Sequence, residues 1–171
     1  MVNVKIARPN SIEKKIVAAL RKVDRQYLRY GKKDSKWTRA IKNAIGDVGK
    51  KLGYEVYAAQ CKYGHYGEWM CDLIWCKMDD DITLKLPLVM ESEWGKDILS
   101  DFTKLVVARA EHRVLVFYGR TLQNIQKTIE PLLKQVRNFR GSKKGDRYLF
   151  CFWTKEPDEF NYNIYITTRY L

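Results

Sequence analysis

Apolar residues recur along the chain with two different spacings, and these spacings predict the order of its helices and strands. Steps of three and four residues predict a first helix capped by Ser11, and three more over 36–52, 97–112 and 121–138. Alternating or continuous apolar runs predict strands over 54–60, 68–77, 83–94, 113–118, 148–154 and 162–170. The expected order is therefore two helices, three strands, a helix, a strand, a helix and two strands.

The third predicted strand sets the expected fold class. It contains the continuous apolar run Leu86–Met90, which is typical of a strand covered on both faces. The helix predicted over 97–112 joins it to another apolar strand, which favours a right-handed parallel crossover. The sequence thus predicts an α/β fold with a mixed central sheet flanked by helices. Two local expectations are a left-handed Gly53 after the second helix and a last helix split or kinked at Pro131.

The length of 171 residues predicts one domain. Within it we distinguish an N-terminal basic helical extension (1–34), a core (35–118), and a C-terminal helix with its strands (119–171). No apolar stretch approaches the roughly 20 residues that a membrane span needs, and the first residues lack a secretion signal. We expect a soluble, cytoplasmic protein that does not enter membranes.

The charge of the chain is unevenly distributed. The net charge of +12 divides into +10 over 1–60, −3 over 61–119 and +5 over 120–171. Basic segments neutralise phosphates, which predicts nucleic acid as the partner, although a basic face can also simply be solvated. The predicted contacts are a basic loop and the outer face of the first helix, with residues Arg137, Arg140, Lys143, Lys144 and Arg147 in the loop and Lys14, Arg21 and Arg25 in the helix.

Carboxylates gather at the end of the buried strand in the acidic middle segment. Glu91 and Glu93 are two residues apart, so both point to the same face of a strand. Asp72 lies within the apolar run of the preceding strand, where a carboxylate is costly unless it is paired or bound to a cation. Three converging oxygen ligands suit Mg²⁺ or Mn²⁺, whereas solvation or pairing with lysine is the alternative.

The arrangement of these pieces resembles the PD-(D/E)xK nuclease superfamily, whose members have the restriction-endonuclease-like fold. A helix precedes a hairpin with Asp in one strand and an acidic motif in the next, and a second helix crosses to a further strand. The resemblance covers roughly 35–118, through the segments WTRAIKNAIGDVGKKLGYEVY, GEWMCDLIW, LPLVMESEWG and DFTKLVVARAEHRVLVFYG.

The resemblance implies a role for each residue of the acidic motif. Asp72 and Glu91 would bind the metal with help from the Ser92 carbonyl. Glu93 stands where most members have lysine, an exchange that some restriction enzymes share. Lys104 could supply the missing lysine from the following helix.

Lys104 also has an alternative interpretation, as a surface lysine paired with Asp101. One further position depends on the resemblance. Many members carry a glutamate in the helix before the first strand, and Asp47 is the residue here that could replace it.

Together these features predict a metal-dependent endonuclease, or a nuclease-like protein, that hydrolyses phosphodiester bonds in DNA. The expected cofactor is Mg²⁺ or Mn²⁺ and the expected partner is duplex DNA, with a homodimer as one allowed assembly. The first alternative is a catalytically inactive module on the same fold that binds nucleic acid or a partner protein. The second is an interaction protein without a nucleic-acid role.

Overall fold

The computed structural model describes residues 2–27, 34–64, 70–80, 82–93, 97–156 and 158–169. Within these ranges the chain forms an α/β fold whose elements follow in the order β1 (Val2–Ile6), α1 (Ser11–Tyr27), α2 (Asp34–Lys51), β2 (Glu55–Tyr57), β3 (Leu73–Asp79), β4 (Ile82–Glu93), α3 (Ile98–Val107), β5 (Ala110–Thr121), α4 (Leu122–Asn138), β6 (Arg147–Glu156) and β7 (Asp158–Arg169). The predicted order is confirmed, with β1 as an added strand.

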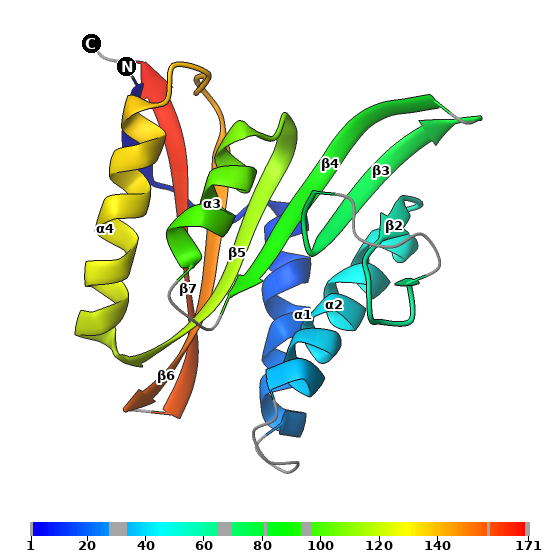
Figure 1. The fold of residues 1–171 in the computed structure, drawn as a ribbon, viewed down its shortest axis with the longest axis horizontal. Helices are drawn as coiled ribbons and strands as arrows, with labels where there is room; N and C mark the ends of the chain where they lie inside the picture. The colour runs from blue at the N-terminus through cyan, green and yellow to red at the C-terminus, as the bar shows by residue number, and fades with distance from the viewer. Residues whose placement is uncertain are drawn as a thin grey trace.

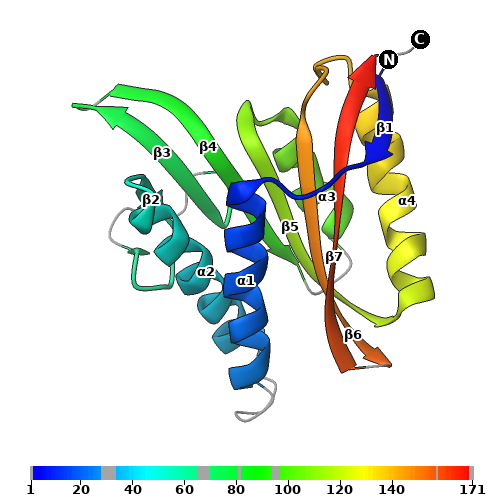
Figure 2. The same ribbon diagram turned by 180° about the vertical axis from the view of Figure 1, so that it is seen from behind.

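The strands form one mixed sheet in the order β1-β7-β6-β5-β4-β3-β2. Strands β4, β5 and β6 are parallel, whereas the other neighbouring pairs are antiparallel. The parallel connection from β4 through α3 to β5 is the crossover that the sequence predicts. Helices α1 and α2 pack on one face of the sheet, and α3 and α4 pack on the other (Figures 1 and 2).

Strand β4 belongs to both hydrophobic cores. Leu88 and Met90 pack into the core beneath α1 and α2, and Val89 packs into the core beneath α3 and α4. All three side chains have no exposed surface. The prediction that this strand is buried on both faces is therefore confirmed. Its burial places Glu91, near the end of the strand, in the interior of the protein.

The N-terminal segment is built into this fold. Strand β1 pairs antiparallel with β7 along an edge of the sheet. Helix α1 buries Ile16 and Leu20 completely. Its N-cap is Asn10 rather than the expected Ser11. The Asn10 side chain accepts a hydrogen bond from the Glu13 amide at 2.9 Å, and the Glu13 carboxylate accepts one from the Asn10 amide at 2.8 Å. This reciprocal capping box satisfies two amides that the helix leaves free.

Helix α3 ends at Val107, five residues before the predicted limit. The guanidinium of Arg113 on β5 donates to the Leu105 carbonyl at 3.0 Å and to the Ala108 carbonyl at 2.9 Å. A strand residue thus satisfies carbonyls that a longer helix would have bonded internally. Helix α4 runs through Pro131 without division, so the expected split is wrong, while the alternative of a kink stays a prediction.

The end of α2 confirms the expectation for Gly53. Its φ is +80°, in the region that favours glycine. The amides of Gly53 and Tyr54 donate to the carbonyls of Lys50 and Gly49, each at 3.0 Å. This pattern is a Schellman motif, which ends the helix and turns the chain into β2.

A buried ion pair joins α1 to the sheet, and its loss should destabilise the fold. Glu13 has no exposed surface, and Arg147 at the start of β6 donates to both of its carboxylate oxygens at 2.7 and 2.8 Å. We predict that Glu13→Ala lowers the free energy of unfolding by about 3 kcal/mol, because the guanidinium loses its partner. Urea denaturation measures the change. Glu111→Ala removes a carboxylate from an exposed pair with Lys85 and should cost less than about 1 kcal/mol. Equal losses in both variants would contradict this role.

Candidate functional site

Asp72 and Glu91 lie together at the ends of two neighbouring strands. Asp72 immediately precedes β3, and the antiparallel pairing of Leu73 with Met90 places it opposite Glu91 near the end of β4. One Asp72 carboxylate oxygen, Oδ2, accepts a hydrogen bond from the Ser92 amide at 2.9 Å. The structure therefore brings together the two carboxylates that the sequence assigns to one site.

The Glu91 carboxylate is almost fully buried, with 3% of the residue exposed. Burial, and then the negative charge of Asp72, raise its pKa from the usual 4.5 to about 7. The ammonium of Lys104 lies 3.2 Å from Glu91 Oε1 and opposes this rise. Glu91 is thus a carboxyl group whose ionisation depends on nearby cations.

Lys104 combines the two alternatives that the sequence left open. Its ammonium lies 2.7 Å from the Asp101 carboxylate on the same helix, as a surface pair would. It also reaches Glu91 on β4. The hydrogen bond with Asp101 is the main cause that raises the pKa of Lys104, so the side chain stays charged. Lys104 therefore places a permanent positive charge at the edge of the site.

Lys42 is the site residue that the sequence analysis missed. It projects from α2 with 3% of its surface exposed. Its ammonium lies 2.9 Å from Asp72 Oδ1 and donates to the Ala59 carbonyl at 3.4 Å. A signal exists in the sequence: Lys42 follows Ile41 and precedes Ile45 by three residues, which places it at the border of the buried helix face.

Glu93 follows on the same strand as Glu91 and is half-buried, at the level of Phe117 on β5. Among the residues that the structure describes, no group of three or more His, Cys, Asp and Glu side chains is arranged to hold a metal ion. The predicted three-carboxylate cluster is therefore reduced to the pair of Asp72 and Glu91.

Two carboxylates are a sufficient protein contribution for Mg²⁺, which commonly keeps several waters and binds one or two acidic side chains. The Ser92 hydroxyl oxygen is buried and has no hydrogen-bond partner among the described residues. Glu91 Oε1 is also buried, and the Lys104 ammonium at 3.2 Å is its ionic partner. The carboxylate oxygens and this unpaired hydroxyl are compatible with a hard cation, with Lys42 as its competitor for Asp72.

The basic loop between α4 and β6 lies at the other end of the sheet, beside the chain termini (Figure 1). The pairing of Glu91 with Leu115, and of Leu115 with Phe150, places Glu91 three residues beyond Arg147 along the strand direction and two strands away from β6. At about 3.3 Å per residue, the separation along the strands is about 10 Å. Sequence patterns do not contain this separation, because it follows from the parallel order of β4, β5 and β6.

The predicted phosphate contacts differ in their availability. Arg140, Lys143 and Lys144 are exposed, and Arg137 is half-buried at the end of α4. The guanidinium of Arg147 is held by Glu13 and by the Arg8 carbonyl, which makes it a structural group.

The remaining predicted positions lie on α1 and α2. Lys14 and Arg21 are exposed on α1, and the Arg21 guanidinium lies 5.8 Å from the centre of the Tyr162 ring. The side chain of Arg25 falls outside the described part of the chain. Asp47 bonds with Tyr63 and Lys62 at the surface, and the α2 residue that reaches Asp72 is Lys42.

Comparisons with protein-family models, with curated proteins and with solved structures find no match to this chain. In the described residues, no helix is long and apolar enough to cross a membrane.

The raised pKa of Glu91 predicts a specific pH dependence of stability in EDTA. The folded state favours the protonated carboxyl group, so its stabilising effect is complete below pH 4.5 and is lost as the pH rises through about 7. Relative to Glu91→Gln, the wild type should lose up to about 3 kcal/mol of unfolding free energy between pH 4.5 and 8. Denaturant titrations at several pH values measure this difference.

A second variant checks the cause of that shift. Lys104→Met removes the ammonium that lowers the Glu91 pKa, so it should move the transition to higher pH. Parallel pH profiles for the wild type and Glu91→Gln would show that Glu91 does not titrate in this range.

Proposed function

We propose that this protein is a metal-dependent nuclease of the PD-(D/E)xK type that acts on DNA, with Asp72 and Glu91 as its central acidic residues. The observation that carries the proposal is the buried carboxylate of Glu91 beside Asp72 at the ends of two adjacent strands. The order of α2, the β3–β4 hairpin, α3 and β5 agrees with the proposed restriction-endonuclease-like fold. The net charge of +12 favours a polyanionic substrate.

Asp72 and Glu91, together with the Ser92 carbonyl, would hold Mg²⁺ or Mn²⁺. A bound metal would supply activation of water and stabilisation of the charge that develops on the phosphate. The protein contributes a largely dry position for the Glu91 carboxylate, where electrostatic interactions are stronger than in water. Asp72 is oriented by the Ser92 amide, which fixes one carboxylate oxygen before any substrate arrives.

Lys104 and Glu93 complete the proposed site. The Lys104 ammonium is anchored by Asp101 and lies next to Glu91, so it can stabilise negative charge on a phosphodiester without rearrangement. Glu93 shares the strand face of Glu91 and would help to orient the attacking water. DNA would approach the end of the sheet where β4 ends, since the loop 139–146 lies at the opposite end.

A second candidate function is an inactive nuclease-fold module that binds nucleic acid or a partner protein. Lys42 favours this alternative, because its ammonium already lies 2.9 Å from Asp72. Two lysines then balance the charges of Asp72 and Glu91, and the carboxylates have less need of a divalent cation. The response of the protein to metal distinguishes the two functions.

We predict that Mn²⁺ raises the melting temperature of the wild type, because a ligand that binds only the folded state stabilises it. Asp72→Asn should abolish this rise. Lys42→Met should lower stability in EDTA and enlarge the rise with Mn²⁺, because it removes the competing ammonium. Asp79→Asn, at the exposed end of β3, is the matched control and should respond like the wild type. Equal responses in the wild type and Asp72→Asn would exclude Asp72 as a ligand.

We predict that Glu91→Gln stops Mg²⁺-dependent cleavage of a labelled duplex while its affinity for DNA in EDTA stays equal or increases. The variant removes a negative charge that would repel phosphate and keeps the size of the side chain. Lys104→Met should slow cleavage by about 10²-fold, since it removes one group that stabilises charge. Lys134→Met on α4 is the control for the loss of a positive charge.

The same assay separates the candidate functions. Salt-dependent binding of DNA without cleavage in either Mg²⁺ or Mn²⁺ would favour the inactive module. Absence of binding at low salt would reject both nucleic-acid functions. Full activity of Glu91→Gln would place the active site elsewhere.

A further inference from the structure

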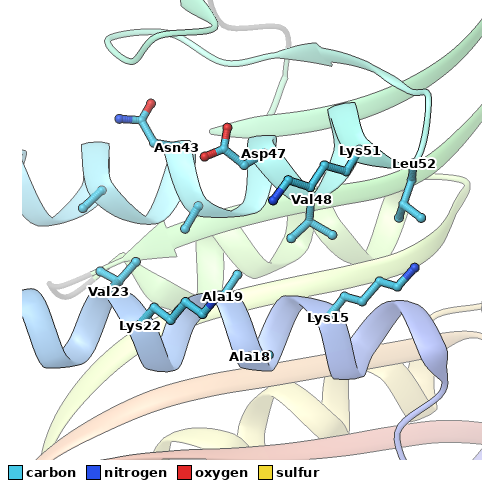
Figure 3. Close-up of a pocket in the computed structure, with 12 residues that line it drawn as sticks. Lys15, Ala18, Ala19, Lys22, Val23, Asn43, Asp47, Val48, Lys51 and Leu52 are labelled. Carbon is cyan, nitrogen blue, oxygen red and sulfur yellow. The ribbon is translucent and has the colours of Figure 1, made fainter.

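An open groove runs between α1 and α2 on the side of these helices that faces away from the sheet (Figure 3). Its volume is about 650 Å³. The floor is aliphatic and only partly buried, with Ala19 from α1 and Ala44, Val48 and Leu52 from α2. Small side chains at the floor allow another backbone to approach the two helices closely. The apolar surface left between α1 and α2 therefore has the shape of a docking site.

Lysines border this apolar floor on both sides. Lys15 and Lys22 are two helical turns apart on α1, and Lys51 lies on the facing part of α2. All three side chains are exposed, and none forms an ion pair with a described residue. The one carboxylate in the lining, Asp47, is paired with Lys62 and hydrogen-bonded by Tyr63. The charge of Lys51 also acts on Asp47 and lowers the pKa of that carboxyl group. The groove therefore presents a net positive charge, with three lysines and one carboxylate around an apolar strip.

We propose that this groove binds an acidic amphipathic helix of a partner protein. An amphipathic helix places apolar residues at i, i+3, i+4 and i+7 along one face, which matches a narrow apolar strip between two helices. Acidic residues on the flanks of that face would meet Lys15, Lys22 and Lys51. Since Lys15 and Lys22 are seven residues apart, a complementary helix carries acidic residues at the same spacing, which is about two turns.

Two other occupants agree less well with these observations. A second copy of this chain would bring a like-charged surface, because α1 and α2 each carry five basic and two acidic residues. The alanine, valine and leucine side chains of the floor offer no hydrogen-bonding groups to nucleic acid. The site at which we propose that DNA is cleaved lies elsewhere, at Asp72 and Glu91 on the sheet. The proposal is independent of whether that site cuts DNA.

The test uses a synthetic 14-residue peptide with leucines at i, i+3, i+4 and i+7 and glutamates on both flanks. Fluorescence anisotropy in EDTA measures its binding to the full chain. We expect the triple variant Lys15→Glu, Lys22→Glu, Lys51→Glu to weaken binding by about tenfold or more. The matched control carries the same number of charge reversals on the other side of the molecule, at Lys127, Lys134 and Lys144, and should keep the wild-type affinity.

A second variant tests the apolar floor without a change of charge. Ala44→Phe fills the groove and should weaken the peptide by a similar factor, while circular dichroism and the melting temperature report whether the fold is kept. Peptides with glutamine for glutamate, or with a scrambled order, should bind poorly. Three results would overturn the proposal: no binding of the acidic peptide, binding that neither groove variant changes, or displacement of the peptide by duplex DNA or by self-association of the chain.

Discussion

The burial of strand β4 is the constraint on which the candidate site depends. Because both faces of this strand are covered, the Glu91 carboxylate at its end is carried into the interior beside Asp72. Each carboxylate is then met by a lysine from a different helical layer, Lys104 from α3 and Lys42 from α2. Helices on opposite faces of the sheet thus contribute cations to one strand end, and the site can form only when all three layers are assembled.

The parts of the fold that were predicted from the sequence are those dictated by local patterns. The apolar run of β4, the helical stripes and Gly53 each determine structure within a few neighbouring residues. The errors came from contacts between distant segments. Strand β1 is defined by its pairing with β7, and α3 ends early because Arg113 of β5 bonds its last carbonyls. No periodicity in the sequence contains that information.

The site shows the same division between local and distant information. Asp72 and Glu91 could be placed together because one hairpin connects their strands. Lys42 could not, because its role depends on how α2 packs against the sheet. The distance of the loop 139–146 from the site was equally hidden, since it follows from strand direction rather than from composition. Charge along the sequence predicts a polyanionic partner but carries no information on how far the basic loop lies from Asp72 and Glu91.

Two buried carboxylates of this protein, Glu13 and Glu91, differ in their bonding. Glu13 is completely buried, yet both of its oxygens accept hydrogen bonds, from Arg147 and from the Asn10 amide. Glu91 is also buried, and it pairs with the Lys104 ammonium at 3.2 Å, but it lies beside the negative charge of Asp72, which helps to raise its pKa to about 7. Apolar side chains in place of a buried ion pair are often at least as stabilising, so burial alone explains neither carboxylate. The hydrogen bonds of Glu13 to α1 and β6 give it a structural role, whereas the explanation that we offer for Glu91 is the proposed metal site.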